Sequence, residues 1–179
     1  MKRISVVIEG TTPILLHNPL QMGKKKPGKD TIPTPEEEAE AGCYWTDDKK
    51  SLAFPADNIK ASVIVVAPMY KSGKIRLTPF VCGSLYIEPQ MVPFGTKEYS
   101  IDTRRAVIQR QGILRSRPRL NTWKLQFDVL LDEDFPGVPL ETIKMMFEEA
   151  GRRVGIGSFR PQKKGWFGKF KVVQWKETR

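Results

Sequence analysis

An α+β fold, in which helices cover an antiparallel sheet, is predicted by the order of the hydrophobic patterns along this chain. Several short segments carry an apolar residue at every second position, which is typical of half-buried strands. Two longer segments carry apolar residues three or four positions apart, which is typical of helices that bury one face. The chain has 179 residues, of which 40% are hydrophobic, and this suffices for one domain with a substantial core.

The N-terminal part predicts a strand followed by irregular structure. Apolar side chains alternate over residues 3–9, and the apolar segment 11–16, which contains a proline, predicts either a kinked continuation of the strand or a buried turn. Prolines, glycines and lysines dominate residues 18–34, and such a composition cannot bury much surface. We therefore expect a flexible loop over about 18–34.

A short acidic helix and a hairpin are predicted next. Thr34, Pro35 and Glu37 carry the pattern of a capping box with a proline in the first turn, which predicts a helix over residues 35–41. Two short apolar segments around a polar turn follow within residues 43–54, and they predict a hairpin.

The middle of the chain predicts a helix and a long strand. Apolar residues with helical spacing begin after Pro55, and they predict a helix that starts near Asp57 or Asn58. Residues 80–88 alternate between inward and outward positions and predict a strand.

The C-terminal part predicts a strand, a helix and a closing strand. Residues 123–131 show the clearest alternation in the chain, and an amphipathic helix is expected from Pro139 to the start of a glycine-rich stretch. Residues 170–175 predict the last strand. Its expected faces are Phe170, Val172 and Gln174 on one side, and Val173 and Trp175 on the other.

Without the inserted loop and hairpins, the predicted order of elements is βαββαβ. This order most simply forms a ferredoxin-like sheet with both helices on one face. The other face of the sheet is then free for a ligand, as in RRM-like modules that bind RNA.

The composition predicts an acidic partner and excludes several kinds of site. The formal net charge is +10, which attracts nucleic acid or another acidic surface. No apolar run is long enough to span a bilayer and no signal peptide is recognised, so we expect a cytoplasmic protein without a membrane partner. Two distant cysteines and one histidine cannot supply a four-ligand zinc site, and we expect neither a metal nor a cofactor.

Residues 152–171 combine glycines, aromatic residues and cations without one carboxylate. Glycines such as Gly155 and Gly157 let the backbone approach a ligand, so that amide groups can point at phosphate oxygens. The alternative is a glycine-rich turn with buried aromatics and solvated lysines. Flat faces for bases or for the core come from Phe159, Trp166 and Phe167. The expected cationic contacts here are Arg160, Lys163 and Lys164.

A second basic stretch lies over about residues 103–124, and it also lacks acidic residues. Gln111 and Gly112 lie midway between two β-prone runs, which predicts a projecting hairpin. Its cations would repel one another unless something acidic lies between them, which predicts phosphate binding; the alternative is a solvated hairpin. The expected contacts are Arg104, Arg105, Arg110, Arg115, Arg117 and Arg119.

Three local signatures resemble the RAMP superfamily, which supplies backbone and processing subunits of CRISPR ribonucleoprotein complexes. Residues 52–61, LAFPADNIKA, are similar to the family's motif of a strand, a proline, small polar residues, and then a hydrophobe and lysine opening the first helix. The glycine-rich loop from Gly155 to Gly168, between the last helix and the last strand, is the second signature. Gly10 to Pro13, after the opening strand, is the third.

The resemblance implies an RNA-binding subunit. It implies that Lys60 contacts the backbone of a guide RNA near the glycine-rich loop, and that the basic hairpin corresponds to the thumb of the backbone subunits. The implied partners are guide RNA, target RNA or single-stranded DNA, copies of the chain itself, and other subunits of an antiviral complex. The alternative is a diverged or virus-borne relative that serves another nucleic-acid task.

Catalysis is the less favoured interpretation. Processing members of the superfamily cut RNA without a metal ion, commonly through a histidine, and the candidate here is His17 with Tyr44 or a nearby lysine. Some backbone members use an aspartate after the first strand, for which Asp30 is the counterpart. We expect a non-catalytic subunit. The alternatives are a metal-independent endoribonuclease that uses His17, and a viral protein that binds single-stranded DNA or RNA.

Overall fold

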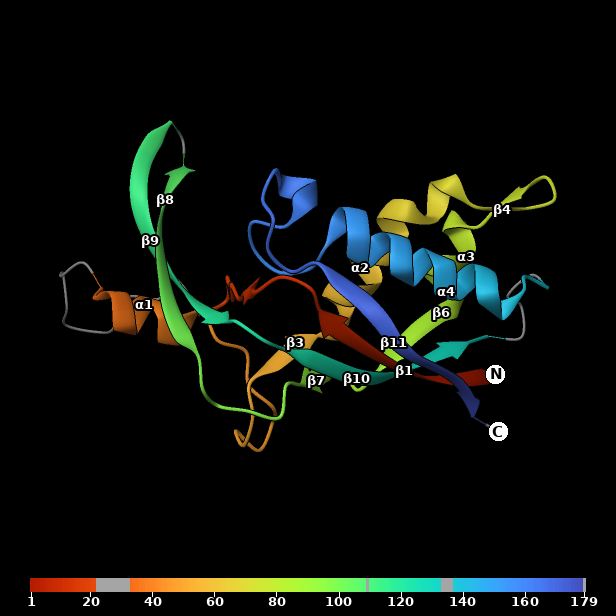
Figure 1. Cartoon of the computed structure of the whole chain (residues 1–179), viewed down its shortest axis with the longest axis horizontal. Coiled ribbons are helices and arrows are strands. Elements are labelled where there is room, and N and C mark those ends of the chain that lie inside the picture. Colours follow the sequence, from red (N-terminus) through yellow and green to blue (C-terminus); the bar gives the residue numbers. More distant parts are fainter. Residues whose placement is uncertain (22–32, 109, 133–136, 179) are drawn as a thin grey trace.

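The computed structural model describes residues 1–21, 33–108, 110–132 and 137–178, and the largest sheet in these ranges has four antiparallel strands (Figure 1). The strands are β1 (Lys2–Gly10), β6 (Leu85–Glu88), β10 (Lys124–Leu131) and β11 (Phe170–Thr178), in the order β11-β1-β10-β6. The fold is therefore α+β, as predicted. Most of the loop expected over residues 18–34, including Asp30, lies outside the described residues.

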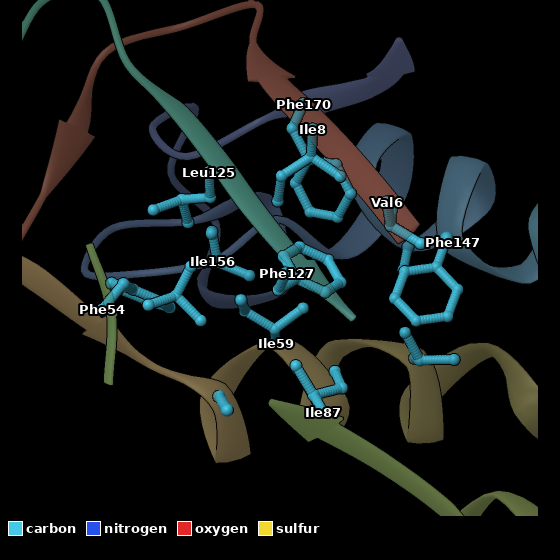
Figure 2. Packing of buried hydrophobic residues seen from close by; sticks show 14 of the residues in the cluster. Val6, Ile8, Phe54, Ile59, Ile87, Leu125, Phe127, Phe147, Ile156 and Phe170 are labelled. Atoms are coloured by element: carbon cyan, nitrogen blue, oxygen red, sulfur yellow. The ribbon is translucent and has the colours of Figure 1, made fainter. Parts of the chain in front are cut away.

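Two helices cover one face of this sheet and bury the core beneath them. They are α2 (Ala56–Val66), between β1 and β6, and α4 (Leu140–Glu149), between β10 and β11. Figure 2 shows Ile59 of α2 and Phe147 of α4 packed with Phe127 of β10 and Val6 of β1. Each such fully buried apolar side chain contributes roughly 1.5–3 kcal/mol to stability.

The alternating patterns of β1 and β10 are confirmed. Every second side chain of β1, from Ile4 to Ile8, is fully buried, and so are Leu125 and Val129 of β10. Val6 of β1 pairs directly with Phe127, so the buried positions of the two strands face the same helices.

The predicted acidic helix is confirmed as α1 (Pro35–Ala41). The Thr34 hydroxyl accepts a hydrogen bond from the Glu37 amide at 3.2 Å, and the Glu37 carboxylate accepts one from the Thr34 amide at 3.2 Å. This reciprocal capping box satisfies two amides that the first turn would otherwise leave without acceptors.

The predicted start is confirmed for α4 (Leu140–Glu149) but is wrong for α2 (Ala56–Val66). α2 begins at Ala56, directly after Pro55, and no side chain caps it, so neither Asp57 nor Asn58 is the cap. Pro55, with its restricted φ and extended conformation, is the last residue of β3 (Ala53–Pro55) and leads into the helix without a polar cap. α4 begins after Pro139 as expected and continues through a wider π-helical turn, Ala150–Val154.

The strand expected over residues 80–88 is wrong in its first half. The chain forms a helix there, α3 (Thr78–Ser84), and only then the short strand β6. Pro79 suits the first turn of a helix. Val81 and Leu85 are both buried and lie four residues apart, so they fit one face of a helix as well as one face of a strand.

The face assignment of the last strand is wrong after its third residue. Val7 of β1 pairs with Gln174 and Ile8 pairs with Val172, so Val173 is the extra residue of a β-bulge. A bulge shifts the alternation by one residue. Trp175 therefore packs on the core with Val172, while Val173 is 45% exposed.

The predicted basic hairpin is confirmed and projects from the body of the molecule (Figure 1). Its strands are β8 (Ser100–Ile108) and β9 (Gln111–Leu120), and β2 (Ile14–Leu15) pairs with β9 to complete a three-stranded sheet. Ile108 pairs with Gln111, so the reversal comes before Gln111 instead of at Gln111–Gly112.

The remaining strands are short. β3 (Ala53–Pro55) pairs with β7 (Met91–Pro93), and β4 (Lys71–Ser72) pairs with β5 (Ile75–Arg76) at the end of the molecule opposite the basic hairpin (Figure 1). The hairpin expected within residues 43–54 consists of a single bridge between Trp45 and Leu52. Within the described residues, no helix is both long and apolar enough to cross a membrane.

We predict that Gly168→Ala destabilises the fold. Gly168 has a φ of +69°, and a Cβ atom there would lie 1.7 Å from the Ile156 carbonyl oxygen. Strained backbone together with this overlap should cost at least about 2 kcal/mol of unfolding free energy, measured by urea denaturation. Gly83→Ala is the matched control, because a Cβ atom at Gly83 in α3 meets nothing within 4 Å. Equal stability of the two variants would contradict the prediction.

Candidate functional site

The two basic stretches come together through one short buried segment. β2 pairs with β9 of the hairpin on one side. On the other side, the amides of Ser158 and Gly168 in the glycine-rich loop donate to the carbonyls of Leu15 at 2.9 Å and Pro13 at 2.8 Å. The hairpin and the glycine-rich loop, far apart in sequence, therefore form one surface.

Arginines of the hairpin stack on aromatic rings of the loop. The Arg104 and Arg119 guanidinium carbons lie 4.6 and 5.7 Å from the centre of the Phe167 ring. The Arg117 guanidinium carbon lies 5.1 Å from the centre of the Phe159 ring. These three arginines share one face of the hairpin, because directly paired residues of antiparallel strands point to the same side.

This stacking limits which rings can bind bases. Phe167 is only 1% exposed, so its expected role in base stacking is wrong and its role in the core is correct. Phe159 is half-buried under Arg117. Trp166 is 51% exposed and packs on Phe167 with a centroid distance of 4.7 Å, so it keeps a free surface for a base.

Acidic residues outside the basic stretch neutralise part of the hairpin. Asp102, with a side chain only 7% exposed, contacts Arg104 and binds Arg119 at 3.2 Å. The hydrogen bond from Arg104 is the largest of the effects that lower the pKa of Asp102. Glu38 of α1 binds Arg115 at 2.7 Å and accepts the Ser116 amide at 2.9 Å. Three of the expected phosphate contacts are therefore already held by carboxylates.

Other expected contacts are exposed and form no ion pair with any described residue. They are Arg105 and Arg110 on the hairpin, and Lys163 and Lys164 in the glycine-rich loop. The Arg160 guanidinium donates to the Gly157 carbonyl at 3.0 Å. Arg105 pairs with Leu114 and so lies on the face of the hairpin opposite Arg104 and Arg117, whereas Lys163 and Lys164 belong to the loop.

The glycines shape the loop through its own packing. A Cβ atom at Gly157 would lie 2.6 Å from the Leu15 carbonyl oxygen, so the close approach there is to β2. The Gly155 amide donates to Ala150, which removes it from the expected set of free donors. The amides of Gly157 and Phe159 have no acceptor among the described residues.

A cleft of about 270 Å³ opens between the glycine-rich loop and α2. Polar groups from Asn58, Ser158 and Gln162 line it together with apolar atoms of Phe54 and Val65. His17 also lines the cleft, as do Tyr44, Gly157 and Arg160. Such a mixture of apolar walls and a few polar groups is typical of sites for small organic groups.

Lys60 lies on a different side of α2. Its ammonium donates to the Cys82 carbonyl at 2.7 Å and sits 5.2 Å from the centre of the Tyr86 ring. Asn58 and Ser62 of the same helix line the cleft instead. The structure thus does not bring Lys60 together with the glycine-rich loop.

His17 and Tyr44 are brought together, but through the backbone. The Tyr44 hydroxyl donates to the His17 carbonyl at 2.8 Å. Partial burial is the main cause of a lowered pKa of His17, and the charges of Arg117 and Arg115 add to it, while Glu38 acts in the opposite direction. Within the described residues, no group of three or more His, Cys, Asp or Glu side chains could hold a metal ion.

The sheet face opposite the helices does not concentrate cations. Arg3 binds Asp128 at 2.7 Å and Glu88 at 3.3 Å across the strands. Tyr86 is exposed there over 43% of its surface. This mixed surface differs from the aromatic and basic sheet face by which RRM-like modules bind RNA.

Comparison with known proteins adds no assignment: no family model matches the chain, and no similar curated protein was found.

Several residues of the surface could not be predicted from sequence. Asp102, Glu38 and Asn58 act through contacts that depend on the fold. The register of the hairpin would have revealed Asp102, because it lies opposite Arg117 in the paired strands. No local signal indicates that Glu38 reaches the hairpin.

We predict that His17 titrates below its ordinary pKa of 6.5 in the free protein. A lowered pKa means that folding favours the neutral ring. The stability that this provides is complete above pH 6.5, and it is lost as the pH falls through the lower pKa that His17 has in the folded protein. Because His17 is the only histidine, its NMR signal is unambiguous, and His17→Gln should weaken this pH dependence. A measured pKa of His17 at or above 6.5 would contradict the prediction, because it would mean that the charge of Glu38 outweighs burial and the two arginines.

Proposed function

We propose that the protein binds single-stranded nucleic acid through the phosphate backbone, with guide RNA as its primary ligand, as a non-catalytic subunit of a CRISPR-type ribonucleoprotein. The observation that carries the proposal is the union of the basic hairpin and the glycine-rich loop in one surface. Exposed Arg105, Arg110, Lys163 and Lys164 supply phosphate contacts, and the exposed Trp166 supplies a stacking surface.

The topology supports a ferredoxin-like fold. β1, α2 and β6 form one crossover with β10 inserted between the two strands, and β10, α4 and β11 form a second with β1 inserted. Two such split crossovers, with both helices on one face, are the pattern of this fold. With the motif around Pro55 and the glycine-rich loop, this arrangement supports membership of the RAMP superfamily.

The surface favours sequence-independent binding along a strand. Flexible, solvated cations attract phosphates without selecting a base, while the arginines stacked on Phe167 keep fixed positions. Binding through such contacts should weaken steeply with salt, because each neutralised phosphate releases counterions.

We predict that Arg105→Gln with Arg110→Gln lowers the salt dependence of RNA binding. For single strands the slope of log affinity against log salt should fall by about 0.7 for each phosphate that the variant no longer neutralises. The measurement is fluorescence anisotropy of a labelled RNA oligomer over a salt series. Lys71→Gln with Lys74→Gln is the matched control, since it removes the same charge from the β4–β5 hairpin at the opposite end. If the slope of log affinity against log salt were the same for the two double variants, the basic hairpin would not be part of the binding surface.

Nucleic acid that co-purifies with the protein tests the guide RNA itself. RNA of uniform length with a shared repeat would support the proposal, whereas heterogeneous RNA or DNA would indicate a general single-strand binder. Absence of bound nucleic acid, and of affinity for added strands at about 150 mM salt, would refute it. Cleavage of added RNA that His17→Ala abolishes would instead identify an endoribonuclease.

A further inference from the structure

Arg117 is a buried cation that forms no ion pair with a carboxylate of the described residues, although Glu38 and Asp102 lie near enough for their charges to act on it. It is only 9% exposed, and its Nε atom has no hydrogen-bond partner. Asp102 lies opposite Arg117 in the hairpin, yet its carboxylate contacts Arg104 and Arg119. Glu38 is likewise occupied by Arg115 and the Ser116 amide.

Such an arrangement is costly for the free protein. A buried charge without a partner loses its hydration and gains no compensating ion pair. Burial accordingly lowers the pKa of Arg117, and the charge of Arg115 adds to this effect, while the charges of Glu38 and Asp102 act in the opposite direction without reversing it. A site that keeps an unpaired guanidinium in this position is prepared for an anion.

The surroundings indicate where that anion lies. The Arg117 guanidinium stacks on Phe159, whose neighbours Ser158 and Arg160 line the cleft with His17. His17 lines this cleft together with Ser158 and Arg160, and the charge of Arg117 is one of the causes that lower the pKa of His17. The Phe159 amide has no acceptor among the described residues. The Arg117 guanidinium is thus joined through Phe159 to the loop residues that line the cleft.

We propose that Arg117 and His17 form a binding site for the phosphate group of a nucleotide, with the attached nucleoside in the neighbouring cleft. A guanidinium can bind two phosphate oxygens at once, and the His17 ring supplies a further donor. In the cleft, Phe54 and Val65 offer apolar contacts, while the amides of Asn58 and Gln162 can hydrogen-bond a base. The inference rests on the proposed function only where the nucleotide belongs to an RNA strand.

The first experiment uses the full chain and the NMR signal of His17. Uridine 5′-monophosphate should shift this signal and raise the pH at which it titrates, because the phosphate stabilises the protonated ring. The charged groups that already act on His17 are Arg115, Arg117 and Glu38, and they are present in every sample. Inorganic phosphate should act in the same way at higher concentration, whereas uridine at equal concentration should leave the titration unchanged.

Arg117→Met then separates a binding role from a structural one. We expect the affinity for uridine 5′-monophosphate to fall at least about tenfold, since the variant removes a hydrogen-bonding charge. We expect the unfolding temperature to stay equal or rise, since an unpaired buried charge is removed. Arg76→Met, which removes an exposed arginine from β5, is the control for charge. Unchanged affinity with a lowered unfolding temperature would overturn the proposal.

A third variant keeps the test decisive if Arg117→Met does not fold. His17→Ala changes an exposed residue, and it should weaken binding of the mononucleotide while the fold is retained. Unchanged binding of uridine 5′-monophosphate to His17→Ala would exclude this residue from the site and overturn the proposal.

RNA oligomers distinguish the two sources of the phosphate. An RNA oligomer that shifts the His17 signal in the parent protein but not in Arg117→Met would identify an internal phosphate of a bound strand. A mononucleotide that binds through Arg117, in a protein without affinity for RNA, would support this site and refute the proposed function. A third outcome would overturn the site and leave the proposed function intact. In that outcome RNA binds the parent protein and Arg117→Met equally, and neither RNA nor uridine 5′-monophosphate shifts the NMR signal of His17.

Discussion

Backbone hydrogen bonds on both sides of residues 13–16 hold the basic surface together. The Leu16 amide donates to Pro118 of the hairpin, and the Pro13 and Leu15 carbonyls accept amides of the glycine-rich loop. Ile14, Leu15 and Leu16 are fully buried, so the segment cannot shift without exposing apolar surface. One short stretch after β1 thereby fixes the hairpin relative to the loop, and the relative positions of the cations on both depend on it.

Electrostatics divides the hairpin into two functional parts. Asp102 and Glu38 hold Arg104, Arg115 and Arg119 in fixed positions beside the glycine-rich loop. Charge-assisted contacts of this kind preorganise a surface before a ligand arrives. The exposed arginines further along the hairpin have no such partner among the described residues. The hairpin thus has a base whose arginines are held by carboxylates and an outer part whose arginines are exposed to water.

The elements that sequence predicted well are those determined by local chemistry. The alternation of β1 and β10 and the capping box at Thr34 depend on residues close together in the chain. α3 was missed because Val81 and Leu85 fit both a helical and a strand period. The bulge at Val173 is invisible in the sequence, since it arises from pairing with β1. Lys60 was expected beside the loop because the motif gives its helix but not the side of the helix on which its ammonium lies.

The glycine-rich stretch shows why composition alone could not define the site. Glycines, aromatics and cations suggest a phosphate cradle, but Gly157 and Gly168 are required by the approach of the protein's own backbone, and Phe167 belongs to the core. Cations are equally ambiguous, since several bind carboxylates from distant elements. The informative property is whether a buried charge has a partner, and that depends on the whole fold. Among the described residues Arg105 and Arg110 are also unpaired, but they are exposed to water, whereas Arg117 is buried and its Nε atom has no partner. This buried, unpaired charge is therefore stronger evidence for a bound anion than the basic composition around it.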